Sequence, residues 1–119
     1  MIHGIGLDLV ETERVEKLRR RQERFPYRVL TKNELSTYFT LSETRKTEFL
    51  AGRFAAKEAY AKAVGTGIGS DCSFQDIEII ADEKGKPHIV ASTDYKIHLS
   101  ITHTKAYAAA QVILESEKT

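Results

Sequence analysis

The feature that most constrains this chain is residues 48–65, a stretch of strong helix-forming residues with no proline. Alanine, leucine, lysine, glutamate and arginine favour helices, so we predict one long α-helix over about residues 43–64. Gly65 follows and is a typical residue at which a helix ends. Small side chains within the helix would let another element or a ligand approach closely: Ala55, Ala56, Ala59, Ala61 and Ala63.

Two charged residues of this helix, Glu58 and Lys62, are four positions apart and therefore lie on one face. An ordinary exposed ion pair has the same spacing as a pair of functional groups. The helix alone does not decide between these two interpretations, so the rest of the chain has to be considered.

Length and composition favour one globular domain over residues 1–119. The single cysteine, Cys72, excludes an internal disulfide and a cysteine-rich zinc site. No apolar run approaches the roughly 20 residues that a membrane-spanning helix needs. Met1 and the residues after it do not resemble a signal peptide. We therefore expect a cytoplasmic protein with no membrane contact.

Charge is unevenly distributed along the chain. Residues 14–32 contain eight basic and two acidic side chains, so this segment carries +6 although the whole chain carries only +1. A locally basic segment on a nearly neutral protein indicates an acidic partner of limited size. A general nucleic-acid-binding protein would usually be basic overall, so we expect no nucleic-acid partner.

Residues 2–9 alternate with the two-residue period of a β-strand. One face carries apolar side chains, and the other carries Gly4, Gly6 and Asp8. Glycines on one face permit another backbone to approach closely. Asp8 is either a functional carboxylate on the glycine face or the cap of the helix that follows.

Two helices are predicted between this strand and the central helix. Residues 12–25 form the first, which Pro26 should close, and residues 32–40 form the second after a T-x-x-E capping box. The arginine-rich first helix fits a solvated face. It equally fits a docking face with Leu18 or Phe25 as an apolar anchor.

The second half of the chain predicts an antiparallel β meander. Its strands are expected over residues 74–80, 88–91, 97–103 and 107–114. The glycine-rich loop 65–69 follows a helix, so it does not fit a dinucleotide-binding turn. His103 ends an apolar strand face, where a lone histidine is more often structural than catalytic. The expected fold class is α+β, with an N-terminal strand, a helical first half and a long central helix.

Residues 6–8, 54–62 and 100–104 read Gly-Leu-Asp, Phe-Ala-Ala-Lys-Glu-Ala-Tyr-Ala-Lys and Ser-Ile-Thr-His-Thr. Together they resemble the phosphopantetheinyl transferases, and most closely the small bacterial holo-acyl-carrier-protein synthases. The resemblance covers nearly the whole chain. It implies transfer of the 4′-phosphopantetheine arm of coenzyme A to a serine of apo acyl carrier protein, with release of adenosine 3′,5′-bisphosphate, in fatty acid biosynthesis.

The resemblance also implies roles for individual residues. Asp8 and Glu58 would bind Mg²⁺, and Lys62 would neutralise or protonate the departing phosphate. The general base stays open between Glu58, a metal-bound water and His103, so the catalytic set is Glu58, Lys62 and His103. Larger relatives have a further acid where this chain has Val10, which predicts only two metal-binding carboxylates. Coenzyme A contacts are expected at Arg53, Lys62, Gly65, Thr66 and His103.

The same resemblance gives the basic helix an acidic partner, the acyl carrier protein. The expected docking residues are Arg14, Leu18, Arg21, Arg24 and Phe25. It also implies a homotrimer with active sites between protomers. Two alternatives are a binding module without chemistry, which would not require Asp8, Glu58 and Lys62 to converge, and a metal-dependent phosphohydrolase, which would break down coenzyme A without carrier protein.

Overall fold

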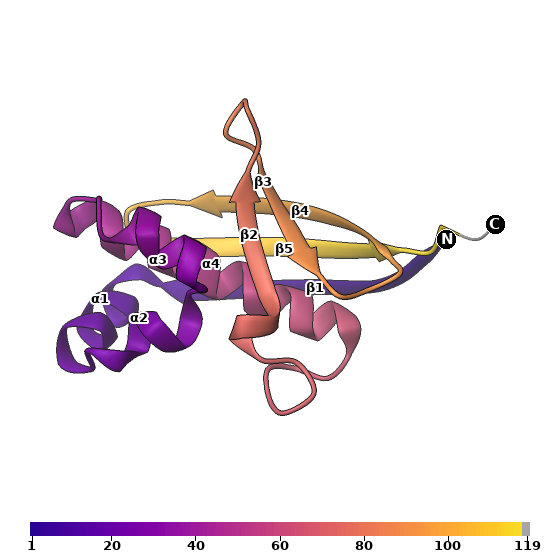
Figure 1. Ribbon diagram of the computed structural model, residues 1–119, viewed down its shortest axis with the longest axis horizontal. Helices are drawn as coiled ribbons and strands as arrows, with labels where there is room; N and C mark the ends of the chain where they lie inside the picture. The colour runs from indigo at the N-terminus through magenta and orange to yellow at the C-terminus, as the bar shows by residue number, and fades with distance from the viewer. Residues whose placement is uncertain (118–119) are drawn as a thin grey trace.

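The computed structural model describes residues 1–117. Along the chain the elements are β1 (Ile2–Glu11), α1 (Thr12–Arg21), α2 (Arg24–Val29), α3 (Lys32–Tyr38), α4 (Glu43–Val64), the 3₁₀-helix η1 (Phe74–Asp76), β2 (Ile77–Ala81), β3 (Pro87–Ala91), β4 (Lys96–His103) and β5 (Tyr107–Glu115). The helices therefore fill the first half, and the predicted α+β class is confirmed (Figure 1).

The strands form two antiparallel ladders. One sheet has the order β1-β5-β4, so the N-terminal strand pairs with the C-terminal strand, and β2 pairs with β3 in a separate hairpin. Figure 1 shows this hairpin running steeply across the long direction of the β1-β5-β4 sheet. The antiparallel second half was predicted correctly, but among the described residues no ladder joins β3 to β4.

Helix α4 packs against the sheet at very short range through the glycine face of β1. A Cβ added at Gly6 would overlap the carbonyl oxygen of Ala59, and one at Gly4 would overlap that of Ala63. Only residues without a side chain permit this approach, which confirms the close contact that the glycine pattern predicts. The distance between β1 and α4 is therefore set by backbone atoms, which places Asp8 next to the helix.

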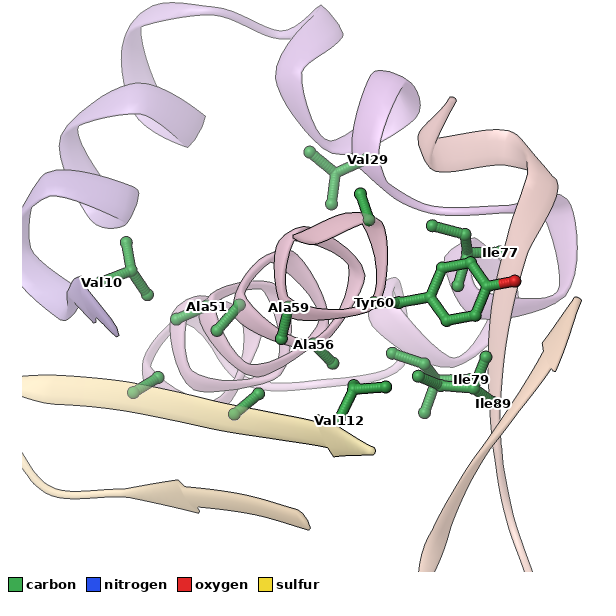
Figure 2. Packing of buried hydrophobic residues seen from close by; sticks show 14 of the residues in the cluster. Val10, Val29, Ala51, Ala56, Ala59, Tyr60, Ile77, Ile79, Ile89 and Val112 are labelled. Carbon is green, nitrogen blue, oxygen red and sulfur yellow. The ribbon is translucent and has the colours of Figure 1, made fainter. Parts of the chain in front are cut away.

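Alanines and aliphatic residues fill the space around α4. Figure 2 shows α4 end-on, with Ala56 and Ala59 toward Val112 of β5, and Tyr60 toward the isoleucines of the β2–β3 hairpin. Val112 and Ala59 are fully buried. The small side chains of the central helix are thus used for packing against the sheet.

The opposite face of β1 remains apolar and open in the single chain. Ile5, Leu7 and Leu9 are 58%, 63% and 64% exposed. A contiguous exposed apolar row of this kind commonly marks a protein–protein contact.

Three predicted boundaries are wrong. Residues 12–25 do not form one helix: α1 ends at Arg21, and α2 begins at Arg24 with Pro26 inside it. Proline is tolerated there because N–H groups in the first turn of a helix have no intrahelical partner. The helix predicted over residues 32–40 ends at Tyr38, and Phe74–Asp76 is a 3₁₀-helix instead of strand.

Among the described residues, no helix is both long enough and apolar enough to cross a membrane.

Candidate active site

A lysine of α4 and an aspartate of β1 meet at one end of the helix–sheet contact. Nζ of Lys62 lies 2.9 Å from Oδ1 of Asp8 and donates a second hydrogen bond, 3.1 Å long, to the carbonyl oxygen of Leu7. The Asp8 side chain is 14% exposed and that of Lys62 is 50% exposed. Asp8 lies inside β1 and does not cap α1, whose N-cap is Glu11. The ion pair is therefore accessible from solvent, mainly on the Lys62 side, and a ligand could reach it there.

Glu58 completes this cluster from the preceding turn of α4. Burial raises the pKa of its carboxyl group, the nearby charge of Asp8 raises the pKa further, and Lys62 partly offsets both effects. Lys62 forms its ion pair with Asp8 instead of Glu58, so the simple exposed pair within the helix is not the arrangement found. Two carboxylates and one ammonium group thus converge from segments about 50 positions apart in the sequence.

The cluster fits a small divalent cation bound through oxygen. Mg²⁺ typically takes one or two carboxylates from a protein, and a cation would relieve the mutual repulsion of Asp8 and Glu58. Val10 is 7% exposed and packs in the core, so it adds no oxygen to the cluster. Among the described residues, no group of three or more His, Cys, Asp or Glu side chains could hold a metal.

The loop after α4 begins close to this cluster. Gly65 caps the helix with a φ of 102°, a left-handed conformation that glycine adopts without strain. Its N–H donates to the carbonyl oxygen of Ala61, and the Thr66 hydroxyl donates to the carbonyl oxygen of Gly67. Gly65 and Thr66 are exposed, so both are open to a ligand that lies across the end of α4.

The other predicted coenzyme A residues lie elsewhere in the single chain. The guanidinium of Arg53 stacks 3.9 Å from the centre of the Phe49 ring, its Nε is buried without a hydrogen-bond partner, and burial lowers its pKa. His103 ends β4, where its Nδ1 lies 3.7 Å from a carboxylate oxygen of Glu48. Glu48 precedes Glu58 by ten residues, about 15 Å along a helix, so His103 does not join the cluster within one chain.

The predicted docking residues divide into exposed and buried members. Arg14, Leu18 and Arg21 line one groove of about 380 Å³ on α1, together with Glu11, Glu13 and Lys17. Arg24 is exposed at the start of α2. Phe25 is only 6% exposed and its ring packs 5.9 Å from that of Phe54, so it belongs to the core and is not a surface anchor.

A family model described as the 4′-phosphopantetheinyl transferase superfamily matches residues 4–113. The chain belongs to this superfamily. The activity predicted from the sequence, that of a 4′-phosphopantetheinyl transferase, is therefore confirmed.

Curated relatives and solved structures agree with this family. The chain is 59% identical over 117 residues to a holo-[acyl-carrier-protein] synthase of Bacillus subtilis, which covers 97% of each chain. A crystal structure of a holo-(acyl-carrier-protein) synthase from Bacillus anthracis, in complex with CoA (3′,5′-ADP), matches with a TM-score of 0.94 and 54% identity over 98% of this chain and 99% of that one. The synthase of Neisseria meningitidis matches with a TM-score of 0.90 and 35% identity over 98% of this chain and 100% of that one.

A buried ionic cluster in this superfamily fold was not predicted from the sequence. Lys57 and Glu34 form an ion pair 2.6 Å long, with side chains that are 0% and 2% exposed. Position 57 lies on the same helix face as the buried residues Leu50 and Ala61. A lysine on a buried face needs a partner, which is the signal that could have revealed the cluster.

Proposed function

We propose that this chain, acting as a single domain over residues 1–119, transfers the 4′-phosphopantetheine arm of coenzyme A to a serine hydroxyl of apo acyl carrier protein. The observation that carries the proposal is the convergence of Asp8, Glu58 and Lys62 in a member of this superfamily. The serine oxygen bonds to the phosphorus that carries the arm. The phosphorus–oxygen bond to the nucleotide breaks, and adenosine 3′,5′-bisphosphate leaves.

In this proposal Asp8 and Glu58 hold Mg²⁺. When bound, the ion supplies positive charge that neutralises the diphosphate during transfer. Two hydrogens of the Lys62 ammonium are engaged by Asp8 and the Leu7 carbonyl oxygen, so its third N–H remains to donate to the departing phosphate. Glu58 is one candidate to take the serine proton, because its carboxylate lies in the same cluster as Asp8 and Lys62. His103 is the other candidate base.

The proposal includes a homotrimer in which neighbouring chains share each active site. The exposed apolar row of Ile5, Leu7 and Leu9 supports such a contact. The separation of His103 from Glu58 within one chain supports it further, since a second copy could supply His103 to the cluster. A single species at the chain mass of 13.4 kDa in sedimentation would contradict the trimer.

Reversing a charge on α1 should weaken the carrier protein interaction selectively. For Arg21→Glu we expect the KM for carrier protein to rise about tenfold or more, because an attraction to acidic side chains becomes a repulsion. The dissociation constant for coenzyme A should stay within twofold, since Arg21 lies on α1 and the proposed site is on β1 and α4. Steady-state kinetics and calorimetry measure these constants.

Lys84→Glu is the matched charge reversal for this measurement, because Lys84 is an exposed cation in the turn between β2 and β3. It should leave both constants unchanged. Equal weakening of carrier protein and coenzyme A binding by Arg21→Glu would show that α1 is structural and not a docking face.

The direct test of the proposed function is the intact mass of apo acyl carrier protein after incubation with this protein, coenzyme A and Mg²⁺. We expect a gain of one phosphopantetheine arm, abolished by EDTA. No gain with several carrier proteins would contradict the transferase. Loss of coenzyme A without carrier protein would instead indicate a phosphohydrolase.

We also propose a cytoplasmic location and a role in fatty acid biosynthesis, where carrier protein and coenzyme A would both be available. The single cysteine of the chain fits a reducing compartment. Recovery of the protein outside the cytoplasm on cell fractionation would contradict this location.

A further inference from the structure

The strongest feature outside the proposed catalytic cluster is the ammonium group of Lys57. It is completely buried, and its Nζ donates three hydrogen bonds: to Oε1 of Glu34 at 2.6 Å, to the carbonyl oxygen of Val29 at 2.7 Å and to that of Phe74 at 3.1 Å. A lysine ammonium has three donors, so each one has an acceptor. The three acceptors come from α2, α3 and η1, none of which is adjacent to Lys57 in the sequence.

Glu34 extends the same network to further elements. Its Oε1 also accepts the Thr31 N–H at 2.8 Å, and its Oε2 accepts the Ile79 N–H at 2.8 Å. The carboxylate thus caps α3, binds α4 through Lys57, and holds β2. Apart from the bond from Thr31, which is the N-cap of α3 itself, every hydrogen bond of this buried pair therefore fixes one element relative to another.

The anchored elements carry groups on which the proposed reaction depends. Val29 is the last residue of α2, whose first residue, Arg24, is one of the exposed docking cations. Phe74 is the first residue of η1, which follows the loop that begins at Gly65 beside the catalytic cluster. Lys57 itself immediately precedes Glu58 on α4, about 100° around the helix.

Aromatic contacts join α4 to two of the same elements, α2 and η1. The Phe54 ring lies 5.9 Å from that of Phe25 in α2 and 5.6 Å from that of Phe74 in η1. Tilted ring contacts of this kind fill volume but tolerate small shifts, whereas three directed bonds from one ammonium group do not. The ionic contacts therefore specify the relative placement of α2, η1 and α4 more sharply than the apolar contacts do.

We propose that Lys57, together with Glu34, is a positioning residue that holds α2, which carries the docking residue Arg24, and the 3₁₀-helix η1 in register with Glu58. The inference rests on the proposed function. A buried ion pair contributes less to stability than well-packed apolar residues of similar volume, so its use here is to select one geometry. Carrier protein bound at Arg24 then presents its serine at a fixed distance from the catalytic cluster.

The test is Lys57→Met, which keeps an unbranched side chain and removes the three donors. We expect kcat/KM for carrier protein to fall about 10²-fold per folded molecule, the scale of a misplacement of roughly 1 Å. The dissociation constant for coenzyme A, measured by calorimetry, should stay within twofold, because the Asp8–Lys62 pair is retained and Gly65 stays hydrogen-bonded to Ala61 of α4. Circular dichroism gives the folded fraction at the assay temperature.

Leu114→Ala is the control for lost stability, since Leu114 is fully buried on β5 and has no part in docking or catalysis. Its kinetic constants per folded molecule should equal those of the unchanged protein. If Lys57→Met also retained those constants and only melted earlier, the pair would be merely structural and the inference would be overturned.

Glu34→Gln decides the question if Lys57→Met does not fold. This variant keeps the shape of the side chain and one oxygen acceptor while removing the charge and the second acceptor. We expect a smaller fall in kcat/KM for carrier protein, at least about threefold, with coenzyme A binding intact. Unchanged kinetics would overturn the inference. Absence of transfer by the unsubstituted protein would instead overturn the proposed function.

Discussion

Glu58→Gln should reduce the transfer rate about 10³-fold while leaving the fold intact. Glu58 is only partly buried, and glutamine preserves its size. The amide removes the negative charge that would hold Mg²⁺ next to Asp8, and it cannot accept the serine proton. The rate is measured from the mass of apo acyl carrier protein at saturating coenzyme A, and the fold by circular dichroism.

Glu83→Gln provides the matched control, because Glu83 is an exposed glutamate in the turn between β2 and β3. Its rate should not change. A Glu58→Gln variant that transferred at the rate of the unsubstituted protein would rule out Glu58 both as a metal ligand and as the base.

The raised pKa of Glu58 predicts that the unsubstituted protein and Glu58→Gln differ in how their stability depends on pH. In the metal-free protein the carboxyl group of Glu58 should titrate at a pH above that of an ordinary glutamate, since burial and Asp8 favour the protonated form. Folding raises this pKa, so the charged carboxylate costs stability at neutral pH, and that cost disappears as the pH falls through the raised value. Glu58→Gln should therefore gain stability at neutral pH and lose the advantage in acid.

Gly6→Ala should destabilise the protein by at least about 3 kcal/mol, a large part of the total stability of a small domain. The new Cβ would overlap the carbonyl oxygen of Ala59 and would lie 2.8 Å from the carbonyl carbon of Ala59 and from the backbone nitrogen of Ala63. Backbone atoms inside α4 cannot rotate away as a flexible side chain could. Strand β1 would have to separate from the helix. Urea unfolding followed by circular dichroism measures the loss.

Gly52→Ala is the contrasting substitution in the same interface. A Cβ there would meet only Cγ2 of Ile101, at 3.6 Å, an ordinary van der Waals distance. Because alanine favours helix over glycine by about 1 kcal/mol, this variant should be as stable as the unsubstituted protein or more stable. If Gly6→Ala were tolerated as well as Gly52→Ala, the contact between β1 and α4 would have to be looser than described.

Local sequence patterns predicted most of the elements, and they failed where local signals conflict. The long helix begins at Glu43 and ends at Val64, as its composition and Gly65 indicate. The helix expected over residues 12–25 was wrong, because Pro26 was interpreted as a stop although it occupies the first turn of a second helix. Phe25 was expected on the surface as an apolar anchor for the carrier protein, but it packs against Phe54. Neither the position of Pro26 inside a second helix nor the burial of Phe25 can be inferred from neighbouring residues alone.

The sequence by itself determined the helix, the alternation of β1, and the motif residues Asp8, Glu58 and Lys62, because each depends on spacing along the chain or on residue type. The tertiary structure alone decided that Lys62 pairs with Asp8 and not with Glu58, and that Lys57 joins three other elements instead of remaining in solvent. It also placed His103 far from Glu58 within one chain. These contacts link residues 17 to 55 positions apart, and such pairings are fixed by packing, which no local spacing specifies.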